Sequence, residues 1–149
     1  MGPSHRWRRI AGWILGIAAV LGLAIQFIPY GRRHDNPPVR REPAWDSART
    51  LALVRRACFD CHSNEVRWPW YSHVAPMSWL VQRDVDRGRR ELNFSEWDRR
   101  QGKADDAAEE VREGRMPPWF YLPVHPEARL SPAEKSDLLE GLRATIGED

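Results

Sequence analysis

The apolar run near the amino terminus constrains the fold of this chain more than any other feature. It extends from Ile10 to Ile28, contains no charged residue and has one strongly polar side chain, Gln26. A helix of this length would span about 28 Å, close to the hydrocarbon thickness of a bilayer. Trp13 and Tyr30 lie near its two ends, where aromatic side chains favour the membrane interface. The pattern predicts a single transmembrane helix, and a cleaved signal peptide is the alternative.

The charges are distributed unevenly on the two sides of residue 44. Residues 1–44 carry seven Lys or Arg and two Asp or Glu, a net charge of +5, whereas residues 45–149 carry 16 and 19, a net charge of −3. The basic excess therefore flanks the apolar run, which suits lipid head groups and argues against a nucleic-acid-binding domain. We predict a short amino-terminal segment at 1–9, a transmembrane anchor at 10–30, an extended linker with three prolines at 31–44 and a folded domain at 45–149.

The folded domain is predicted to be all-α, because its apolar residues recur at helical spacing and nowhere alternate as in a strand. The clearest signal is Ser131-Pro-Ala-Glu134, which orders an N-cap, a proline and a capping glutamate before a helix that ends at Gly147. Other helices are predicted at about 46–57, at about 75–89 with its exit at Gly88, from Ser95 onward, and at about 103–114.

The motif Cys58-Phe-Asp-Cys61-His62 contains the only two cysteines of the chain. Cys-x-x-Cys-His is the attachment pattern of c-type haem, in which two thiols bind one porphyrin edge and the His ligates the iron. A thioredoxin-like dithiol would need a βαβ context, and a zinc site would need two more ligands, of which His73 is the nearest candidate. A disulfide between Cys58 and Cys61 would stabilise the chain little. The predicted cofactor is one haem c, covalently bound through both cysteines.

A low-spin haem iron also needs a sixth ligand, which we predict to be Met116. This residue precedes two prolines, and a stiff loop loses less entropy when its thioether binds the iron. Met77 fits the apolar stripe of its predicted helix, so core packing suits it better. The predicted iron ligands are His62 and Met116, while His73, His125 or an open position remain alternatives.

An aromatic segment follows the predicted iron ligand. We predict that Trp68, Trp70 and Tyr71 wall one edge of the haem and exclude water, with helix packing as the alternative. Three nearby arginines could pair with the haem propionates, although we favour a solvated helix face for them: Arg87, Arg89 and Arg90.

Seven stretches of the folded domain resemble the haem-binding domain family, small bacterial proteins related to c-type cytochromes. They cover about residues 57–142 and read Cys58-Phe-Asp-Cys-His-Ser-Asn64, Trp68-Pro-Trp-Tyr-Ser72, Ala75-Pro-Met-Ser-Trp79, Asp84-Val-Asp-Arg-Gly-Arg89, Leu92-Asn-Phe-Ser-Glu-Trp97, Met116-Pro-Pro118 and His125-Pro-Glu-Ala-Arg-Leu-Ser131. The resemblance implies haem c held by Cys58, Cys61 and His62 on a cytochrome c-like helical fold wrapped around one haem. It does not identify a redox partner.

These features together predict a membrane-anchored mono-haem c-type cytochrome that transfers single electrons. A haem-based sensor with an open or displaceable sixth position is the alternative. A peroxidase would need a distal His and Arg beside an open iron, so we predict no enzyme and no small-molecule substrate. Because bacteria attach haem c outside the cytoplasm, we expect a single-pass inner-membrane protein with residues 1–9 in the cytoplasm and the haem domain in the periplasm.

Overall fold

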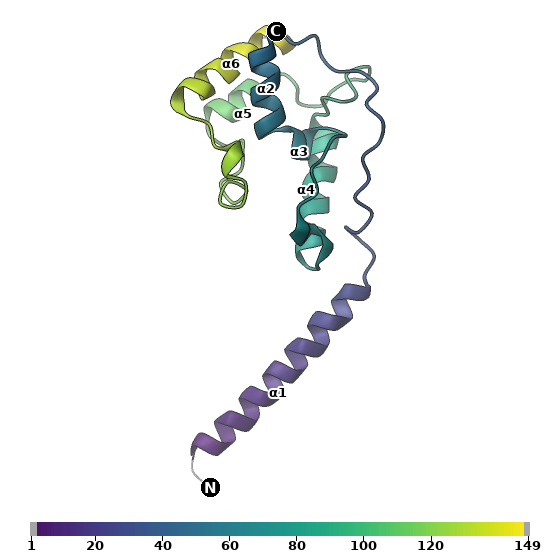
Figure 1. Ribbon diagram of the computed structural model, residues 1–149, viewed down its shortest axis with the longest axis vertical. Helices are drawn as coiled ribbons and strands as arrows, with labels where there is room; N and C mark the ends of the chain where they lie inside the picture. The colour runs from purple at the N-terminus through teal and green to yellow at the C-terminus, as the bar shows by residue number, and fades with distance from the viewer. Residues whose placement is uncertain (1–2, 148–149) are drawn as a thin grey trace. The chain divides into compact units, whose positions relative to one another are not determined.

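The computed structural model describes residues 3–147, and no β-strand occurs among them, which confirms the predicted all-α fold (Figure 1). Residues 1–2 and 148–149, at the outer ends of the predicted amino-terminal segment and folded domain, lie outside this description. The elements in chain order are α1 (Pro3–Ala24), η1 (Ile25–Phe27), α2 (Ala48–Ala57), α3 (Phe59–His62), η2 (Trp70–His73), α4 (Met77–Glu91), α5 (Ala107–Arg112), η3 (Pro126–Ala128) and α6 (Pro132–Ile146).

The chain forms two compact units. The first comprises the chain up to His34 together with Pro69–Arg83, and the second comprises Asp35–Trp68 together with the chain from Asp84 onward. Helix α4 therefore begins in the first unit and ends in the second.

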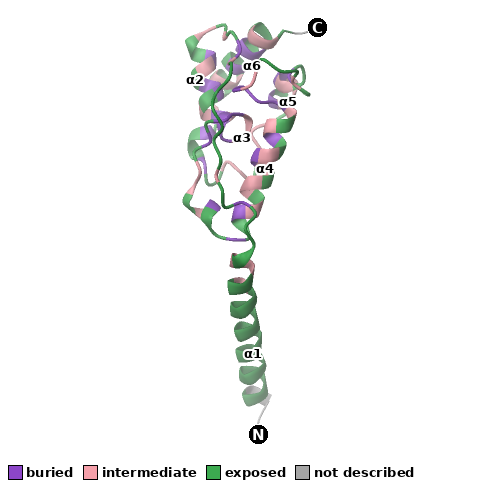
Figure 2. Ribbon diagram, turned by 90° about the vertical axis from the view of Figure 1, so that its right-hand side faces the viewer, coloured by how far each residue is buried: buried purple, intermediate pink, exposed green. Residues whose placement is uncertain are grey.

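Helix α1 of the first unit corresponds to the apolar run. The helical stretch His5–Phe27 contains an 18-residue window with a mean hydropathy of 2.1 and is long and apolar enough to cross a membrane. The helix is almost entirely exposed along its length (Figure 2), and the side chains of Trp13 and Leu15 are 73% and 70% exposed. A helix that is apolar on every side suits a lipid environment by length and composition.

The polar residue of the apolar run, Gln26, pairs with the backbone of Ala75 in the same unit. The Gln26 side-chain nitrogen donates to the Ala75 carbonyl oxygen (2.9 Å), and the Ala75 backbone nitrogen donates to the Gln26 side-chain oxygen (3.0 Å). The side-chain nitrogen also donates to the Gly22 carbonyl oxygen at 3.0 Å. The side-chain amide is thus satisfied by three hydrogen bonds at the carboxyl end of the apolar helix.

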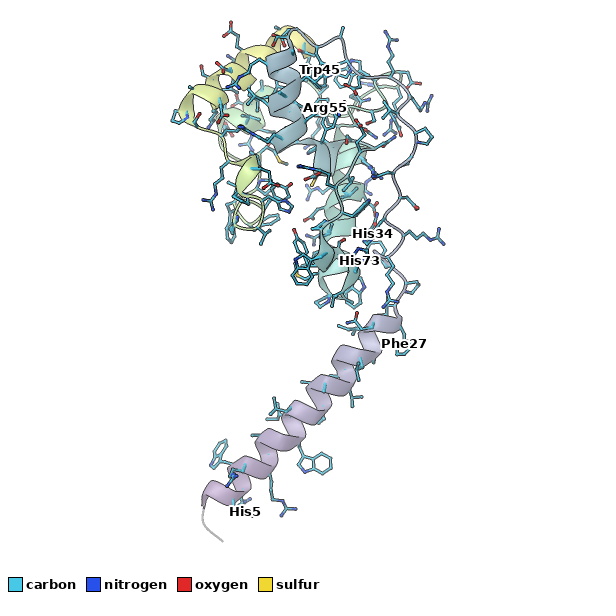
Figure 3. The ribbon with its side chains drawn as sticks, viewed as in Figure 1. His5, Phe27, His34, Trp45, Arg55 and His73 are labelled. Carbon is cyan, nitrogen blue, oxygen red and sulfur yellow. The ribbon has the colours of Figure 1, made fainter. Side chains whose placement is uncertain are left out.

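The residues that follow α1 also pack on the 69–83 segment. Gly31 has a φ of +77° and passes so close to Ser78 that an added Cβ would lie 2.6 Å from its carbonyl carbon, so only glycine fits. The His34 Nε2 atom donates to the Ser72 carbonyl oxygen (3.0 Å), and the His34 ring meets the edge of His73 at a centroid distance of 4.4 Å (Figure 3).

The second unit is built on α2, α5 and α6, with α6 packed against both of the others (Figure 1). Phe94 is almost fully buried at its centre, with the rings of Trp45, Phe59 and Trp97 between 5.3 and 6.1 Å away. Burying a large apolar side chain contributes about 1.5–3 kcal/mol. The core cluster consists of Leu53, Val54, Phe59, Leu92, Phe94, Ala104, Ala108, Val111, Leu138 and Leu142.

The predicted linker is not a free spacer, because hydrogen bonds hold much of it to the second unit. The side chain of Asn36 exchanges two bonds with the backbone of Val66, at 2.9 and 3.3 Å. The Arg40 backbone nitrogen donates to the Ser95 carbonyl oxygen (2.9 Å). These bonds make residues 36–40 part of the fold of the second unit.

Two helix predictions need correction. The helix expected from Ser95 is absent, because the Ser95 hydroxyl accepts from the Asn64 backbone nitrogen (2.9 Å) and its own backbone nitrogen donates to the Asn93 side chain (2.9 Å). The chain there forms turns, and the next helix begins only at Ala107. Helix α4 does not end at Gly88 but continues to Glu91.

Candidate functional site

The five residues from Cys58 to His62 form one compact turn directly after α2, made of Cys58 and the short helix α3. Cys58 closes α2 by donating its backbone nitrogen to the Val54 carbonyl oxygen (2.8 Å), and it also precedes α3 as its N-cap. The Cys58 carbonyl oxygen then accepts from the backbone nitrogens of Cys61 (3.1 Å) and His62 (2.9 Å). Both thiols are free and half-buried. The turn brings two thiols and one imidazole together within a single segment.

The ring of His62 is held by the backbone just beyond α4. Its Nδ1 atom lies 3.0 Å from the Leu92 carbonyl oxygen, and a carbonyl only accepts, so Nδ1 carries the proton. The Nε2 atom therefore keeps its lone pair for a metal. Burial lowers the pKa of His62 below its ordinary value, which also favours the neutral ring. The Phe94 backbone nitrogen donates to the His62 carbonyl oxygen at 2.8 Å.

The two thiols are not activated. Burial and, secondly, the neighbouring Cys61 raise the pKa of Cys58 to about 12. Burial and then the charge of Asp84 raise the pKa of Cys61 to about 12. A redox dithiol needs a thiol with a lowered pKa, so this environment disfavours thioredoxin-like chemistry. Within residues 3–147 no group of three His, Cys, Asp or Glu side chains is placed to hold a metal ion, so a zinc site has no ligand set there.

Helix α4 approaches the turn Cys58–His62, called the attachment turn below, through Gly88. A Cβ at this position would lie 2.9 Å from the carbonyl carbon of Cys61 and closer still to its oxygen. The helical pattern predicted a helix end at Gly88 and did not reveal this close approach. A glycine within a helical pattern was the available signal, because such a glycine usually has a packing reason when it is not a cap.

Met116 lies in the second unit, as does His62. It follows α5 and Gly114, whose φ of +73° agrees with the predicted helix end. The Met116 backbone nitrogen donates to the Glu110 carbonyl oxygen (3.1 Å), and its half-buried side chain packs against the core cluster. Beyond it, Trp119 and Phe120 are 80% and 53% exposed. This loop therefore combines a fixed thioether with exposed aromatic surface.

The predicted aromatic wall is divided between the two units. Trp68 is half-buried in the second unit, whereas Trp70 and Tyr71 lie in the first, with their rings edge to face at 5.9 Å. Trp70 is 79% exposed. Trp79, also in the first unit, buries its indole Nε1 without a hydrogen-bond partner in the part of the chain that the structure describes.

The other predicted residues have structural partners. His125 is buried and stacks on Tyr121 at a centroid distance of 3.9 Å, and its Nδ1 atom lies 3.3 Å from Glu127. Arg87 pairs with Glu91 on an exposed helix face, which agrees with the solvated helix face that the sequence favoured for it. Arg89 instead donates to the Ser63 carbonyl oxygen (2.8 Å) and to the linker, and Arg90 is exposed.

Comparison with known families identifies the family to which the chain belongs. A family model described as a haem-binding domain matches residues 20–144. The chain belongs to the haem-binding domain family. The match extends from the last turns of α1 into α6 and so includes both units. Searches among curated proteins and among solved structures found no match.

The donor set of this haem-binding domain fits haem. Two thiols and a neutral imidazole with a free Nε2 are the groups that c-type haem uses. The hydrogen bond from Nδ1 to a backbone carbonyl is the outer-shell contact that usually orients a metal-binding histidine.

Proposed function

We propose that this protein is a membrane-anchored mono-haem c-type cytochrome that transfers single electrons and is not an enzyme. The observation that carries the proposal is the turn of Cys58, Cys61 and His62, with the His62 Nδ1 atom held by the Leu92 carbonyl oxygen. When bound, haem supplies an iron that takes up and releases one electron, at a potential set by ligands, burial and hydrogen bonds.

Each residue of the proposed site has a distinct role. Cys58 and Cys61 hold the porphyrin through thioether bonds, and His62 is the proximal ligand, made more basic by its bond to the Leu92 carbonyl. Met116 is the second axial ligand, supplied by a loop that is fixed to Glu110. Of the three aromatic residues predicted to exclude water from the haem edge, Trp68 is the one that lies in the same unit as His62.

The proposed location follows from helix α1 together with the covalent haem. The helix has the length and composition of a membrane span, and we propose that it is retained as a single-pass anchor in a bacterial inner membrane. Haem c is attached outside the cytoplasm, which puts the haem-binding domain in the periplasm. Its proposed partners are the membrane and redox proteins, with no nucleic acid and no small-molecule substrate.

The deciding experiment is an optical spectrum of protein produced with a c-type haem maturation system, recorded oxidised, reduced, and reduced with carbon monoxide. A sharp reduced α-band, a far-red ferric band from sulfur–iron ligation and no response to carbon monoxide are expected. Rapid carbon monoxide binding would favour the sensor with an open sixth position. Protein without any haem would contradict the proposal.

Replacing both cysteines tests the covalent link. Cys58→Ala combined with Cys61→Ala is expected to abolish haem that stays with the polypeptide on a denaturing gel, because no thioether can form. Each single variant serves as the control and should retain one thioether and some covalent haem. Covalent haem in the double variant would contradict thioether attachment.

A further inference from the structure

Asp60 lies between the two cysteines of the attachment turn and is not used by the proposed haem ligation. Its carboxylate is nevertheless buried, with the residue 9% exposed. It accepts from the Arg67 backbone nitrogen (3.1 Å), from Arg67 Nε and a terminal guanidinium nitrogen (both 3.3 Å), and from the Tyr121 hydroxyl (2.8 Å). A buried carboxylate is tolerated only when its oxygens are hydrogen-bonded, so these donors hold Asp60 in place.

The shortest of these bonds comes from a segment remote in sequence. Tyr121 lies five residues after Met116, on the loop between α5 and η3. Burial and, secondly, the charge of Asp60 raise the pKa of Tyr121, so its hydroxyl remains a donor. Its ring stacks on His125 with an interplanar angle of 9°.

Tyr121 is also the centre of its own loop. Its backbone nitrogen donates to the Pro118 carbonyl oxygen (3.0 Å), and its carbonyl oxygen accepts from the backbone nitrogens of Val124 (3.3 Å) and His125 (3.2 Å). The start of the loop is fixed where Met116 donates to the Glu110 carbonyl oxygen. A bond at Tyr121 therefore restrains the whole segment 116–125, which contains the predicted ligand Met116 and the alternative His125.

We propose that Asp60 and Tyr121 are positioning residues: their hydrogen bond holds the 116–125 loop against the attachment turn and thereby sets how firmly the loop's ligand binds iron. The iron-ligation part of this inference rests on the proposed function, whereas the positioning part concerns only the chain. Asp60 belongs to the Cys-x-x-Cys-His motif itself. One segment therefore carries both the proximal ligand His62 and the carboxylate that holds the loop of the second ligand.

The test uses the full-length holoprotein with Tyr121→Phe, which keeps the ring stacked on His125 and removes only the hydroxyl. We expect covalent haem to be retained, carbon monoxide affinity of the reduced protein to rise about tenfold, and the far-red ferric band to weaken, because one buried hydrogen bond is worth about that factor. Amide hydrogen exchange at residues 119–125 should also accelerate about tenfold. Tyr30→Phe, in the first unit, is the matched control and should change neither measurement.

Asp60→Asn is the conservative partner variant, because its single side-chain oxygen can still accept from Tyr121, although its amide nitrogen then faces the Arg67 donors. It should show a smaller effect than Tyr121→Phe, and the double variant should match Tyr121→Phe alone. Unchanged loop exchange in Tyr121→Phe would overturn the positioning proposal. If wild-type protein lacks methionine ligation, the proposed ligand is wrong, and loop exchange alone still decides the role of Tyr121.

Discussion

At the residue scale, the sulfur of Met116 is the proposed iron ligand that would distinguish an electron carrier from a ligand-binding haem protein. Met116→Ala is expected to leave the haem attached, because Cys58, Cys61 and His62 are untouched. It should abolish the far-red ferric band and raise carbon monoxide affinity by about tenfold or more, because the methionine no longer competes with carbon monoxide for the iron. A tenfold change in affinity corresponds to about 1.4 kcal/mol. Optical titration with carbon monoxide measures the change.

Met77→Ala is the matched control for this experiment. Met77 begins α4 in the first unit and is 43% exposed, so its loss removes a thioether of the same kind from another segment. A Met116→Ala protein with the wild-type ferric spectrum would show that another residue ligates the iron.

The proximity of Cys58, Cys61 and His62 was predictable because they lie within five residues of one another. One turn of backbone brings the two thiols and the imidazole together. The contacts of Leu92 with His62 and of Tyr121 with Asp60 were not predictable, because they join residues 30 and 61 positions apart. No local pattern encodes such pairs, since they arise only when the helices pack.

At the element scale, the approach of α4 to the attachment turn depends on Gly88. Gly88→Ala is expected to destabilise the protein by about 1–3 kcal/mol, since the new methyl group would overlap the Cys61 backbone, which cannot rotate away. Denaturant unfolding measures the loss. Gly102→Ala is the control, because its Cβ would meet Glu91 at an ordinary contact distance of 3.4 Å. Equal effects of the two variants would contradict the tight approach.

Helix α6 supplies a prediction about pH. Hydrogen bonds from the Ser131 backbone and from Arg56 lower the pKa of Glu134 to about 2. Because this pKa is below its unfolded value, the stabilisation is present above about pH 4.5 and is lost as pH falls toward 2. Glu134→Gln should therefore lose less melting temperature between pH 6 and pH 3 than the wild-type protein does.

Glu140→Gln is the control for the pH experiment, since it removes the same charge from an exposed position of α6 without touching the cap. Thermal unfolding followed by circular dichroism gives the melting temperatures. If Glu134→Gln and wild-type protein lose the same melting temperature, the cap carboxylate contributes nothing to acid stability.

The elements were predictable where local signals act alone. The Ser131 capping box forms as expected and α6 ends before Gly147. Ser47 caps α2, which begins at Ala48, two residues after the predicted start. The expected helix at Ser95 failed because Asn64 and Asn93 occupy its capping groups. Side-chain to backbone hydrogen bonds of this kind compete with a helix and are invisible in a local pattern.

At the scale of the whole molecule, α1 is the proposed membrane anchor. Leu15→Arg combined with Val20→Arg is expected to move the protein from the membrane fraction to the soluble fraction, since each arginine at mid-helix costs about 2.5–3.5 kcal/mol. Fractionation with an alkaline wash measures the shift. Val39→Arg, at an exposed position of the predicted linker, is the control and should stay with the membrane. A double variant that remains membrane-bound would contradict anchoring by α1.

The pairing of Gln26 with Ala75 fixes the rotational phase of α1 within the first unit. One residue inserted between Gln26 and Gly31 would rotate and lengthen the chain between them. It would therefore displace the Gln26–Ala75 contact relative to the Gly31–Ser78 contact. One residue inserted before Gln26 would only lengthen the apolar span by about 1.5 Å and leave both contacts in register. The proposed membrane span would therefore adapt to bilayers of different thickness at its amino-terminal end, while its carboxyl-terminal end keeps a fixed length.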